Sequence, residues 1–204
     1  HLGGGTPTFF SSENLKKLID GIFKRADKFE IFDFSWEGHP NFTSEKQLQT
    51  LYDLGSRRNS FGIQDYDPKV QKAIHRVQSF DQVKKVHELS KKIGYESISH
   101  DLIFGLPFQT EESIRNTIKN TIALKPDRIA YYSYAHVPWI KGVGQRGFED
   151  SDLPKDDEKR YLYELGKQLF FDNGYVEIGM DHFALPSDSL HKAMESKKLH
   201  RNFM

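Results

Sequence analysis

The residues best suited to chemistry stand at the ends of predicted strands. They are an opening glycine run, two carboxylates, an amide and a histidine: residues 3–6, Glu37, Gln64, Asp101 and residues 135–136. Consecutive glycines let the backbone turn sharply and leave its N–H groups uncovered. Carboxylates and an amide beside such N–H groups would suit a ligand that carries both an ammonium and a carboxylate group. Taken singly, each position is equally explained by a tight turn or a helix cap.

Arg76 and the histidines widen the set of candidate residues. Arg76, near the end of a predicted helix, could pair with a ligand carboxylate or simply be a favourable cation at a helix C-terminus. Nine histidines invite a metal hypothesis, but no His-x-x-x-His pair and no compact cluster of ligand residue types appears. A Gly-x-Ser-x-Gly elbow is absent, and the glycine run lacks the Gly-x-Gly-x-x-Gly spacing of a dinucleotide site.

Composition limits the classes of protein that fit. The 204 residues contain 37% apolar and 28% charged side chains, as ordinary globular domains do. The 29 basic and 29 acidic side chains cancel, so no overall field would attract nucleic acid or an anionic membrane. No stretch approaches the ~18 apolar residues of a membrane-spanning helix and no signal peptide is visible, so we predict a cytoplasmic protein. Cysteine is absent, which excludes disulfides and thiolate metal ligands within this span.

Strand and helix signals alternate along the chain. Strands are predicted just before Gly3 and at residues 29–36, 59–64, 97–106, 128–136 and 176–183. Helices are predicted to follow caps at Ser11, Thr43, Asp67, Ser79, Thr110 and Ser187, and to cover residues 156–171. The helix after Asp67 is expected to continue to Val77, and Ser79 with Gln82 matches a capping box.

This alternation predicts parallel strands joined by right-handed crossovers, hence the α/β class. A closed barrel of this type needs eight strands and about 250 residues. About six strands are predicted here, so we expect an open, partial (β/α) barrel with ligands at the C-terminal strand ends. Residues 1–204 would form an incomplete core, with residues 176–204 extending the sheet beyond it. The abrupt start before Gly3 predicts a piece of a longer protein.

Several blocks of sequence support a family resemblance. They read His-Leu-Gly-Gly-Gly-Thr-Pro-Thr at 1–8, Gly-Ile-Gln-Asp at 62–65, Asp-Leu-Ile-Phe-Gly-Leu-Pro-Phe-Gln-Thr at 101–110, Tyr-Ala-His-Val-Pro at 134–138 and Ile-Gly-Met-Asp-His-Phe-Ala at 178–184. In this order they resemble the oxygen-independent coproporphyrinogen III oxidases, a radical S-adenosylmethionine (SAM) family. The first and third blocks are shared with related haem chaperones, whereas the last two are more specific to the oxidases.

The resemblance implies a reaction and its cofactors. In this family a 4Fe–4S cluster, fed by an electron donor protein, reduces SAM to methionine and a 5′-deoxyadenosyl radical. The radical takes a hydrogen from a propionate of coproporphyrinogen III, and loss of carbon dioxide and one electron leaves a vinyl group. Two such steps give protoporphyrinogen IX in haem synthesis. The cofactor then performs the demanding chemistry, while the protein binds, orients and excludes water.

The resemblance also implies roles for individual residues. Gly4 and Glu37 would contact the cluster-bound SAM. A second SAM, which this family holds beside the first, would be contacted by Gly5, Thr6, Gln64, Arg76, Asp101 and Ala135. Arg146, Asp181 and His182 are candidates for the porphyrinogen region. For Asp181 and His182 a salt-bridged pair that orients the last strand is an equal alternative.

The sequence also departs from the family pattern. A Cys-x-x-x-Cys-x-x-Cys loop is expected ahead of Gly3 and a C-terminal region after Phe203, and neither is present. We therefore expect the cluster cysteines upstream of His1, no metal ligands within the chain, and no activity of the chain alone. His39 replaces a usual Asp, and residues 57–59 replace Phe-Asn-Arg. Two other hypotheses remain: a haem chaperone-like relative without oxidase activity, and a non-catalytic SAM-binding module.

Overall fold

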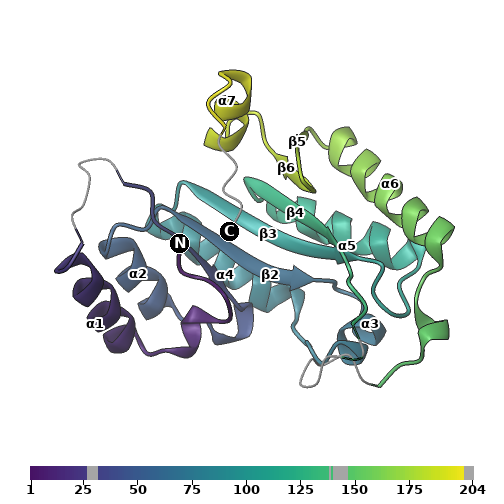
Figure 1. Ribbon diagram of the computed structural model, residues 1–204, viewed down its shortest axis with the longest axis horizontal. Helices are drawn as coiled ribbons and strands as arrows, with labels where there is room; N and C mark the ends of the chain where they lie inside the picture. The colour runs from purple at the N-terminus through teal and green to yellow at the C-terminus, as the bar shows by residue number, and fades with distance from the viewer. Residues whose placement is uncertain (27–31, 138, 140–146, 200–204) are drawn as a thin grey trace.

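The computed structural model describes residues 1–26, 32–137, 139 and 147–199. These residues form one six-stranded sheet with the strand order β1-β2-β3-β4-β6-β5 (Figure 1). Four neighbouring strands run parallel, and the last two add an antiparallel end. The strands are β1 (Ser35–Gly38), β2 (Arg58–Gln64), β3 (Ser97–Phe104), β4 (Arg128–Ser133), β5 (Val176–Gly179) and β6 (His182–Ala184). The sheet ends at β1 and β5 without closing, which confirms the predicted open α/β architecture.

Most of the helices form a layer on one side of this sheet, but the last helix lies apart from that layer and packs against β5 (Figure 1). The helices are α1 (Ser12–Phe23), α2 (Glu45–Asp53), α3 (Pro68–Ala73), α4 (Phe80–Ile93), α5 (Glu111–Leu124), α6 (Asp156–Asp172) and α7 (Ser189–Glu195), with 3-10 turns η1 (Pro7–Phe9), η2 (Pro40–Phe42) and η3 (Asp150–Asp152). Figure 1 shows α4 and α5 behind the strands, and α1, α2, α4, α5 and α6 pack in succession along the layer. None of the helices that the structure describes is long and apolar enough to cross a membrane.

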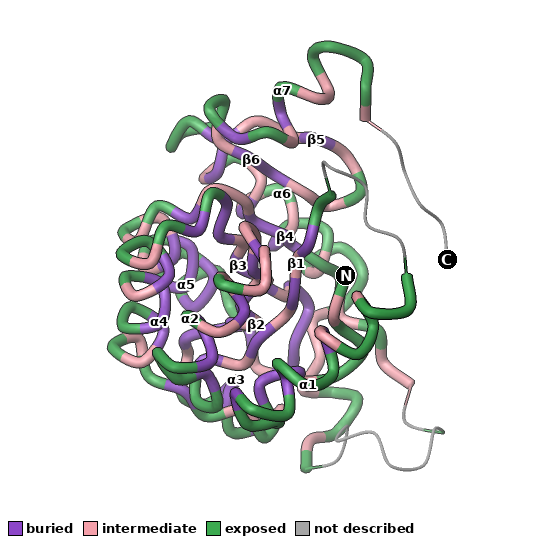
Figure 2. Tube along the Cα trace, turned by 90° about the vertical axis from the view of Figure 1, so that its left-hand side faces the viewer, coloured by how far each residue is buried: buried purple, intermediate pink, exposed green. Residues whose placement is uncertain are grey.

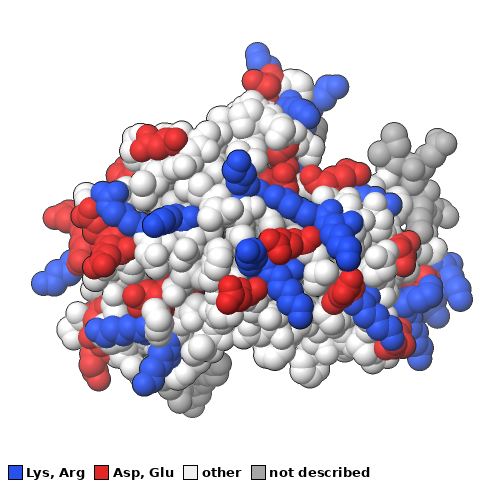
Figure 3. All heavy atoms as spheres, turned by 180° about the vertical axis from the view of Figure 1, so that it is seen from behind, with Lys and Arg blue, Asp and Glu red and all other residues white. Residues whose placement is uncertain are grey.

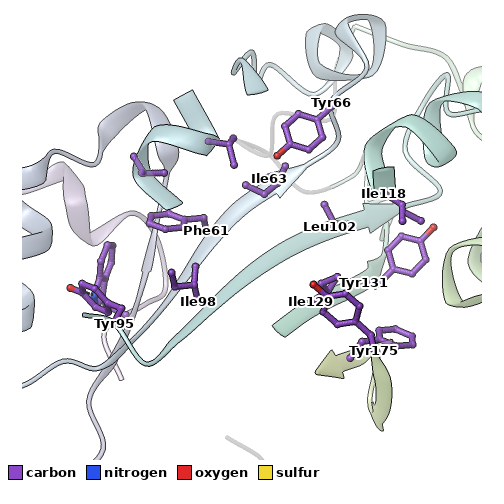
Figure 4. Packing of buried hydrophobic residues seen from close by; sticks show 14 of the residues in the cluster. Phe61, Ile63, Tyr66, Tyr95, Ile98, Leu102, Ile118, Ile129, Tyr131 and Tyr175 are labelled. Atoms are coloured by element: carbon purple, nitrogen blue, oxygen red, sulfur yellow. Dashed lines mark hydrogen bonds between the residues drawn. The ribbon is translucent and has the colours of Figure 1, made fainter. Parts of the chain in front are cut away.

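The core lies between the sheet and this helix layer. Every second residue of β1 and β2 is buried there, among them the fully buried Trp36 and Phe61. Figure 2 shows the buried positions concentrated along the strands and the inner sides of the helices. Figure 4 shows Leu102 of β3 and Ile118 of α5 in the same layer, close to the ring of Tyr131. Each of these side chains removes apolar surface from water, which stabilises the fold by about 1.5–3 kcal/mol.

Most of the predicted helix starts are confirmed. The side chains of Ser11, Asp67, Ser79 and Thr110 each accept a hydrogen bond from a backbone N–H in the first helical turn. Such caps satisfy N–H groups that have no partner inside the helix. The predicted Ser79–Gln82 capping box is only half formed, because the Gln82 side chain instead donates to the Pro40 carbonyl oxygen at 2.9 Å.

Two caps were predicted one residue too early. Helix α2 is capped by Ser44, which forms a reciprocal box with Gln47, and not by Thr43. The Thr43 hydroxyl is already used, since it donates to the His39 carbonyl oxygen at 2.9 Å. Helix α7 is capped by Asp188 and not by Ser187. Two adjacent polar residues before each helix could serve as the cap, and the contacts made in the folded structure decide which of them does.

Other element boundaries also differ from the predictions. Helix α3 ends at Ala73, because His75 adopts a left-handed φ of 53°, and Val77 lies exposed beyond the end. Strand β1 begins at Ser35; residues 29–31 of the predicted strand 29–36 lie outside the described residues. Strands β3 and β4 are each a few residues shorter than predicted.

The last predicted strand, residues 176–183, is in fact a hairpin of β5 and β6. Met180 and Asp181 adopt φ angles of 52° and 60°, which reverse the chain between the two strands. Strand β6 then pairs antiparallel with β4. Non-glycine residues adopt such angles only rarely, so the sequence carried little sign of this turn.

The chain begins beside β1. Leu2 bridges Trp36 in parallel, with Leu2 N–H donating to the Ser35 carbonyl oxygen at 2.9 Å and Glu37 N–H donating to the Leu2 carbonyl oxygen at 3.1 Å. The glycine run therefore leaves the sheet at the same end as the C-terminal end of β1. This agrees with the prediction that the run follows a strand position.

Candidate functional site

The face of the sheet opposite the core is polar. Alternation along β1 to β4 directs Glu37, Ser60, Asp101 and Tyr132 away from the helix layer, and these side chains are half-buried or exposed. A cavity of about 300 Å³ opens on this face. It is lined by His1, Ser35, Trp36, Glu37, Arg58, Asn59, Ser60, Ser97, Ser99, Asp101, Arg128, Tyr132 and His182. This polar face, defined by these residues, is the candidate site.

Glu37 lies at the C-terminal end of β1, where the glycine run passes over it. Its Oε1 lies 2.9 Å from Nε2 of His1, and Nδ1 of His1 lies 2.9 Å from the Ser35 hydroxyl. A Cβ on Gly3 would approach Glu37 Oε1 to 2.8 Å, so only glycine lets the backbone pass this close without displacing the carboxylate. The Glu37 carboxylate is therefore held at the cavity mouth but remains open to solvent on one side.

Asp101 is the most perturbed acid of the polar face. Its Oδ1 accepts a hydrogen bond of 2.7 Å from the Ser60 hydroxyl on the neighbouring strand. Burial raises the pKa of Asp101 to about 6; the Glu37 charge also raises it, and the Ser60 hydrogen bond and the His182 and Arg76 charges only partly offset this. A carboxylate held at such a cost commonly belongs to a functional site, although structural ion pairs also perturb pKa values.

Gln64 and Arg76 lie close to Asp101, because both side chains lie over Gly62, the residue paired with Asp101 on the neighbouring strand. Gly62 pairs with Asp101 across the β2–β3 ladder. A Cβ on Gly62 would come within 2.5 Å of an Arg76 guanidinium nitrogen and 2.8 Å of Gln64 Nε2, so both side chains fold over this glycine. Arg76 donates to the Gly62 carbonyl oxygen at 2.9 Å, while its buried Nε has no partner. Burial lowers the pKa of Arg76, and the Asp101 charge opposes that shift.

His182 closes the far side of the cavity. Its Nε2 lies 3.2 Å from the Tyr132 hydroxyl, and its Nδ1 lies 2.6 Å from the Met180 carbonyl oxygen. Since a carbonyl oxygen only accepts, Nδ1 of His182 carries a proton directed at the Met180 carbonyl oxygen. Burial, together with the nearby Asp101, Glu37 and Asp181 charges, raises the pKa of Tyr132 to about 12, so this hydroxyl stays a donor at neutral pH.

Of the predicted residues that the structure describes, Glu37, Asp101 and His182 line this cavity, whereas Gln64, Arg76 and the others lie around it. Gly4 has a left-handed φ of 80°, and neither Gly4 nor Gly5 has an atom within 4 Å of an added Cβ, so the loop is open. Thr6 caps the η1 turn only through its backbone, and Ala135 follows the end of β4 as an exposed residue.

Asp181 does not share the cavity of His182. It lines a separate hollow with Phe104, Ser133, Asp156, Lys159, Arg160 and Tyr163. The hydrogen bonds of His182 go to Tyr132 and Met180. The alternative of a salt-bridged Asp181–His182 pair is therefore not what the structure has. Arg146 lies outside the described residues.

Sequence reasoning missed the lower half of the polar face. Arg58 pairs with Asp33, and Arg128 donates to Asp188 Oδ1 at 2.8 Å, so both guanidinium groups at the base of the cavity are already neutralised. Ser60 and Ser99 line the wall between them and Asp101. The sequence did contain a signal for this face. Strands buried on both faces are apolar throughout, whereas these strands alternate polar and apolar residues, which predicts one polar face.

The polar face fits a molecule such as SAM. Glu37 and Asp101 supply carboxylates for a cationic group, and Arg76, whose buried Nε has no hydrogen-bond partner, places a cation near the cavity for a ligand carboxylate. An iron–sulfur cluster does not fit this chain, because the sequence contains no cysteine. Among the described residues, no group of three or more His, Asp or Glu side chains could hold a metal ion.

Comparison with known families agrees with this architecture. Residues 1–120 match the family described as the Radical SAM superfamily. Because the match covers more than half of the sequence, the chain belongs to the radical SAM superfamily. The fold is shared more widely: methylornithine synthase, at 14% identity, superposes on 79% of this chain with a TM-score of 0.59, which reflects architecture alone.

Particular relatives share more than the fold. The anaerobic coproporphyrinogen III oxidase 1 of Cereibacter sphaeroides is 42% identical over 100% of this chain and 45% of its own length. The oxygen-independent coproporphyrinogen III oxidase of Helicobacter pylori is 41% identical over 100% of this chain and 44% of its own length. Coproporphyrinogen III oxidase from Escherichia coli, a radical SAM enzyme, superposes on 97% of this chain and 45% of its own, with 34% identity and a TM-score of 0.92. The chain thus spans less than half the length of these relatives.

Proposed function

We propose that this chain is part of an oxygen-independent coproporphyrinogen III oxidase and that its polar face binds SAM. The observation that carries the proposal is the cavity that Glu37 and Asp101 both line, beside the open glycine run. The superposition on the Escherichia coli enzyme over 97% of the chain supports the same conclusion. Within the proposal, residues 1–204 are an incomplete radical SAM core, and residues 176–204 extend its sheet.

Each residue of the proposed site has a role that its surroundings suit. Glu37, with Gly4 beside it, would accept from the ammonium or ribose hydroxyls of one SAM molecule. Asp101 and Gln64 would bind hydroxyl and amine groups of a second SAM, whose carboxylate would take the unpartnered Arg76 Nε. Gly5, Thr6 and Ala135 would contact the same molecule through their backbone at the rim.

The chemistry would be the oxidative decarboxylation of two propionates of coproporphyrinogen III to vinyl groups, giving protoporphyrinogen IX in haem synthesis. SAM supplies the hydrogen-abstracting radical for this reaction. The chain's own residues bind and orient: the polar face holds charged and hydroxyl groups, and the His182 ring and the Tyr132 hydroxyl lie beside them as hydrogen-bonding groups. Arg146, Asp181 and His182 remain candidates for the porphyrinogen region.

The cluster would be supplied by residues outside this sequence. A 4Fe–4S cluster is held by cysteine thiolates, and this sequence has none. We therefore place the cluster cysteines upstream of His1 in the complete enzyme, together with the docking of an electron donor protein. The chain alone would bind SAM but would not turn over porphyrinogen, and we place the complete enzyme in the cytoplasm.

Calorimetric titration of the chain with SAM tests the proposed site. We expect Glu37→Gln and Asp101→Asn each to weaken SAM binding by about 10-fold or more, since each removes a charged hydrogen-bond acceptor. Glu88→Gln, on the outer side of α4, is the matched control and should bind as the unchanged chain does. Equal SAM affinity in all three variants would remove the site assignment.

The haem chaperone hypothesis gains no support from the relatives in Cereibacter sphaeroides and Helicobacter pylori, which are named as oxidases. Its separate test is functional. Haem titration and porphyrinogen turnover would be measured side by side in the complete protein. Turnover without stoichiometric haem binding supports the oxidase, whereas tight haem binding without turnover would refute it.

A further inference from the structure

Asp65, the residue that follows Gln64, is a fully buried carboxylate with three donors around it. Its Oδ1 accepts from the Asp67 N–H at 2.6 Å and from the Thr117 hydroxyl at 2.9 Å. Its Oδ2 accepts from Gln109 Nε2 at 2.6 Å. The donors come from the loop after β2, from α5 and from the loop after β3. Asp65 therefore joins three segments at the C-terminal end of the sheet.

Gln109 carries this connection to the end of β3. Its Nε2 also donates to the Ile103 carbonyl oxygen at 2.8 Å, and its Oε1 accepts from the Leu106 N–H at 2.9 Å. Both of these backbone groups belong to the strand end that follows Asp101. The side chain is buried, so these contacts are not shared with solvent.

Two glutamines extend the connection to Arg76. Gln71 and Gln78 bond reciprocally: Gln71 Nε2 donates to the Gln78 carbonyl oxygen at 2.8 Å, and the Gln78 N–H donates to Gln71 Oε1 at 3.1 Å. Gln71 Nε2 also donates to the Asp65 carbonyl oxygen at 2.9 Å. The Arg76 N–H donates to the Gln71 carbonyl oxygen at 2.9 Å, so the backbone of Arg76 is fixed inside this loop.

The same network fixes the backbone before Gln64. Gln78 Nε2 donates to the Ile63 carbonyl oxygen at 2.5 Å and to the Gly62 carbonyl oxygen at 3.2 Å. Gln64 itself has a left-handed φ of 67°, a conformation that costs a non-glycine residue free energy unless its surroundings hold it. We call Asp65, Gln71, Gln78, Gln109 and Thr117 the buried clamp.

We propose that Asp65 is a positioning residue, whose carboxylate holds the buried clamp together and so sets Gln64 and Arg76 against Asp101 for ligand binding. This inference rests on the proposed function, because Asp65 would position residues of the proposed SAM site. It touches no ligand itself; all of its contacts are to the protein.

The carboxylate is needed because three donors converge on it. An ionised carboxylate offers only acceptors, whereas an amide of the same shape would point N–H groups at N–H donors. Burial raises the pKa of Asp65 to about 6; the Asp67 charge also raises it, and the three hydrogen bonds lower it only in part. Tyr131 of β4 is the other titratable group that interacts with Asp65, and its own pKa is raised, so it stays neutral.

Two buried threonines of α5 provide a matched pair of variants. Thr117 donates to Asp65, and its Oγ1 also accepts from the Tyr66 N–H at 3.0 Å. Thr121, one turn later and equally buried, donates only to the Thr117 carbonyl oxygen inside its own helix. Thr117→Val therefore loses two hydrogen bonds, one of them to the carboxylate of the clamp, whereas Thr121→Val loses one hydrogen bond inside its own helix. Thr117→Ser keeps the hydroxyl and should restore what Thr117→Val loses.

SAM affinity of the 204-residue chain is the first measurement. We expect Asp65→Asn to weaken binding by about 10-fold, as is usual when a partner of a ligand-binding group is removed. We expect Thr117→Val to weaken it about 3-fold, with Thr117→Ser and Thr121→Val unchanged. Equal loss of affinity in the two valine variants would overturn the proposal, because the effect would then be one of stability alone.

Amide hydrogen exchange keeps the proposal testable without SAM. In Asp65→Asn and Thr117→Val, the Leu106 and Gln78 amides should exchange about 10-fold faster, since their acceptors belong to the clamp. The Gly94 amide at the end of α4 should not change. Unchanged exchange at Leu106 and Gln78 would refute the clamp. If the unaltered chain binds no SAM, the proposed function fails, and this exchange measurement still decides whether Asp65 couples the strand ends.

Discussion

Ser60 and Phe61 are neighbours on β2 whose side chains meet opposite surroundings. Phe61 is fully buried under the helix layer, with its ring edge-on to Trp36 at 5.9 Å. Ser60 faces the cavity and donates to Asp101. The same alternation runs through the neighbouring strands, so one sheet has an apolar face and a polar face.

We expect the apolar face of the sheet to determine the stability of the fold and the polar face to determine ligand binding. On the outer side of the helices, acidic and basic side chains are mixed over the surface and neutralise one another (Figure 3). On the polar face, the charge of Glu37 is close enough to disfavour ionisation of Asp101 and so to raise its pKa. An arrangement that costs folding free energy is expected to be kept for binding. Substitutions on each face of the sheet test that division.

The largest effect is expected from the apolar face. Phe61→Ala should lower the free energy of unfolding by about 3–5 kcal/mol, because it leaves a cavity against Trp36. Ser60→Ala, on the adjacent residue, should change it by less than about 1 kcal/mol but weaken SAM binding through Asp101. Urea unfolding and calorimetric titration of both variants measure the two quantities. Equal destabilisation by both changes would contradict the division between the faces.

The second prediction concerns a histidine pair on the helix side. His87 Nδ1 lies 3.1 Å from His100 Nε2, and both rings are buried between α4 and β3. Burial lowers the pKa of His87 to about 4 and that of His100 well below its usual value; the charge of Lys91 lowers both further. In the unfolded chain both titrate near 6.5, so protonation below pH 6.5 favours unfolding.

We therefore expect the free energy of unfolding to fall by about 1.4 kcal/mol per pH unit for each histidine between pH 6.5 and pH 4. The double variant His87→Leu/His100→Leu replaces both partners by apolar groups and should flatten this dependence. His75→Asn, at an exposed position, is the control and should leave it unchanged. Urea unfolding at pH 7, 6 and 5 gives the comparison, and the same slope in the double variant would refute the assignment.

Asp101, on the polar face, should titrate in the opposite direction. Its folded pKa of about 6 lies above the unfolded value near 3.9, so the unfolded chain ionises first. The contribution of Asp101 to stability is therefore lost as pH rises from 4 to 6. Asp101→Asn should be more stable than the unaltered chain at pH 7 by about 1–3 kcal/mol, and equally stable below pH 4. Lower stability of the variant at pH 7 would contradict this.

Two helical glycines give the smallest and most selective effect. A Cβ on Gly166 of α6 would meet the buried Tyr131 ring at 2.5 Å, whereas a Cβ on Gly21 of α1 meets nothing within 4 Å. Alanine is favoured over glycine within a helix by about 0.5–1 kcal/mol. Gly21→Ala should therefore raise the free energy of unfolding by about 0.5–1 kcal/mol. Gly166→Ala should lower it by about 1–2 kcal/mol, and thermal unfolding of both variants measures the difference. A stabilising Gly166→Ala would mean that α6 packs less closely on β4.

Local sequence determined much of this molecule. Ser11, Asp67 and Thr110 were identifiable as helix caps, because a side-chain oxygen that satisfies a first-turn N–H acts within three residues. The alternating strand and helix signals likewise predicted a parallel sheet and placed Glu37 at the end of a strand. For Asp101 the predicted position at a strand end was wrong, because Asp101 lies inside β3, paired with residues of both neighbouring strands. The quoted blocks predicted the radical SAM family, which the comparison confirms.

Only the tertiary structure decided which of these residues meet. Whether Asp181 joins His182 depended on a turn at Met180 and Asp181 whose φ angles are unusual for these residue types, and that turn sends them into different hollows. The buried clamp was equally invisible, since Asp65 and Thr117 are 52 residues apart. Interactions within one turn of chain are encoded locally, whereas contacts between distant segments exist only once the sheet has set their register.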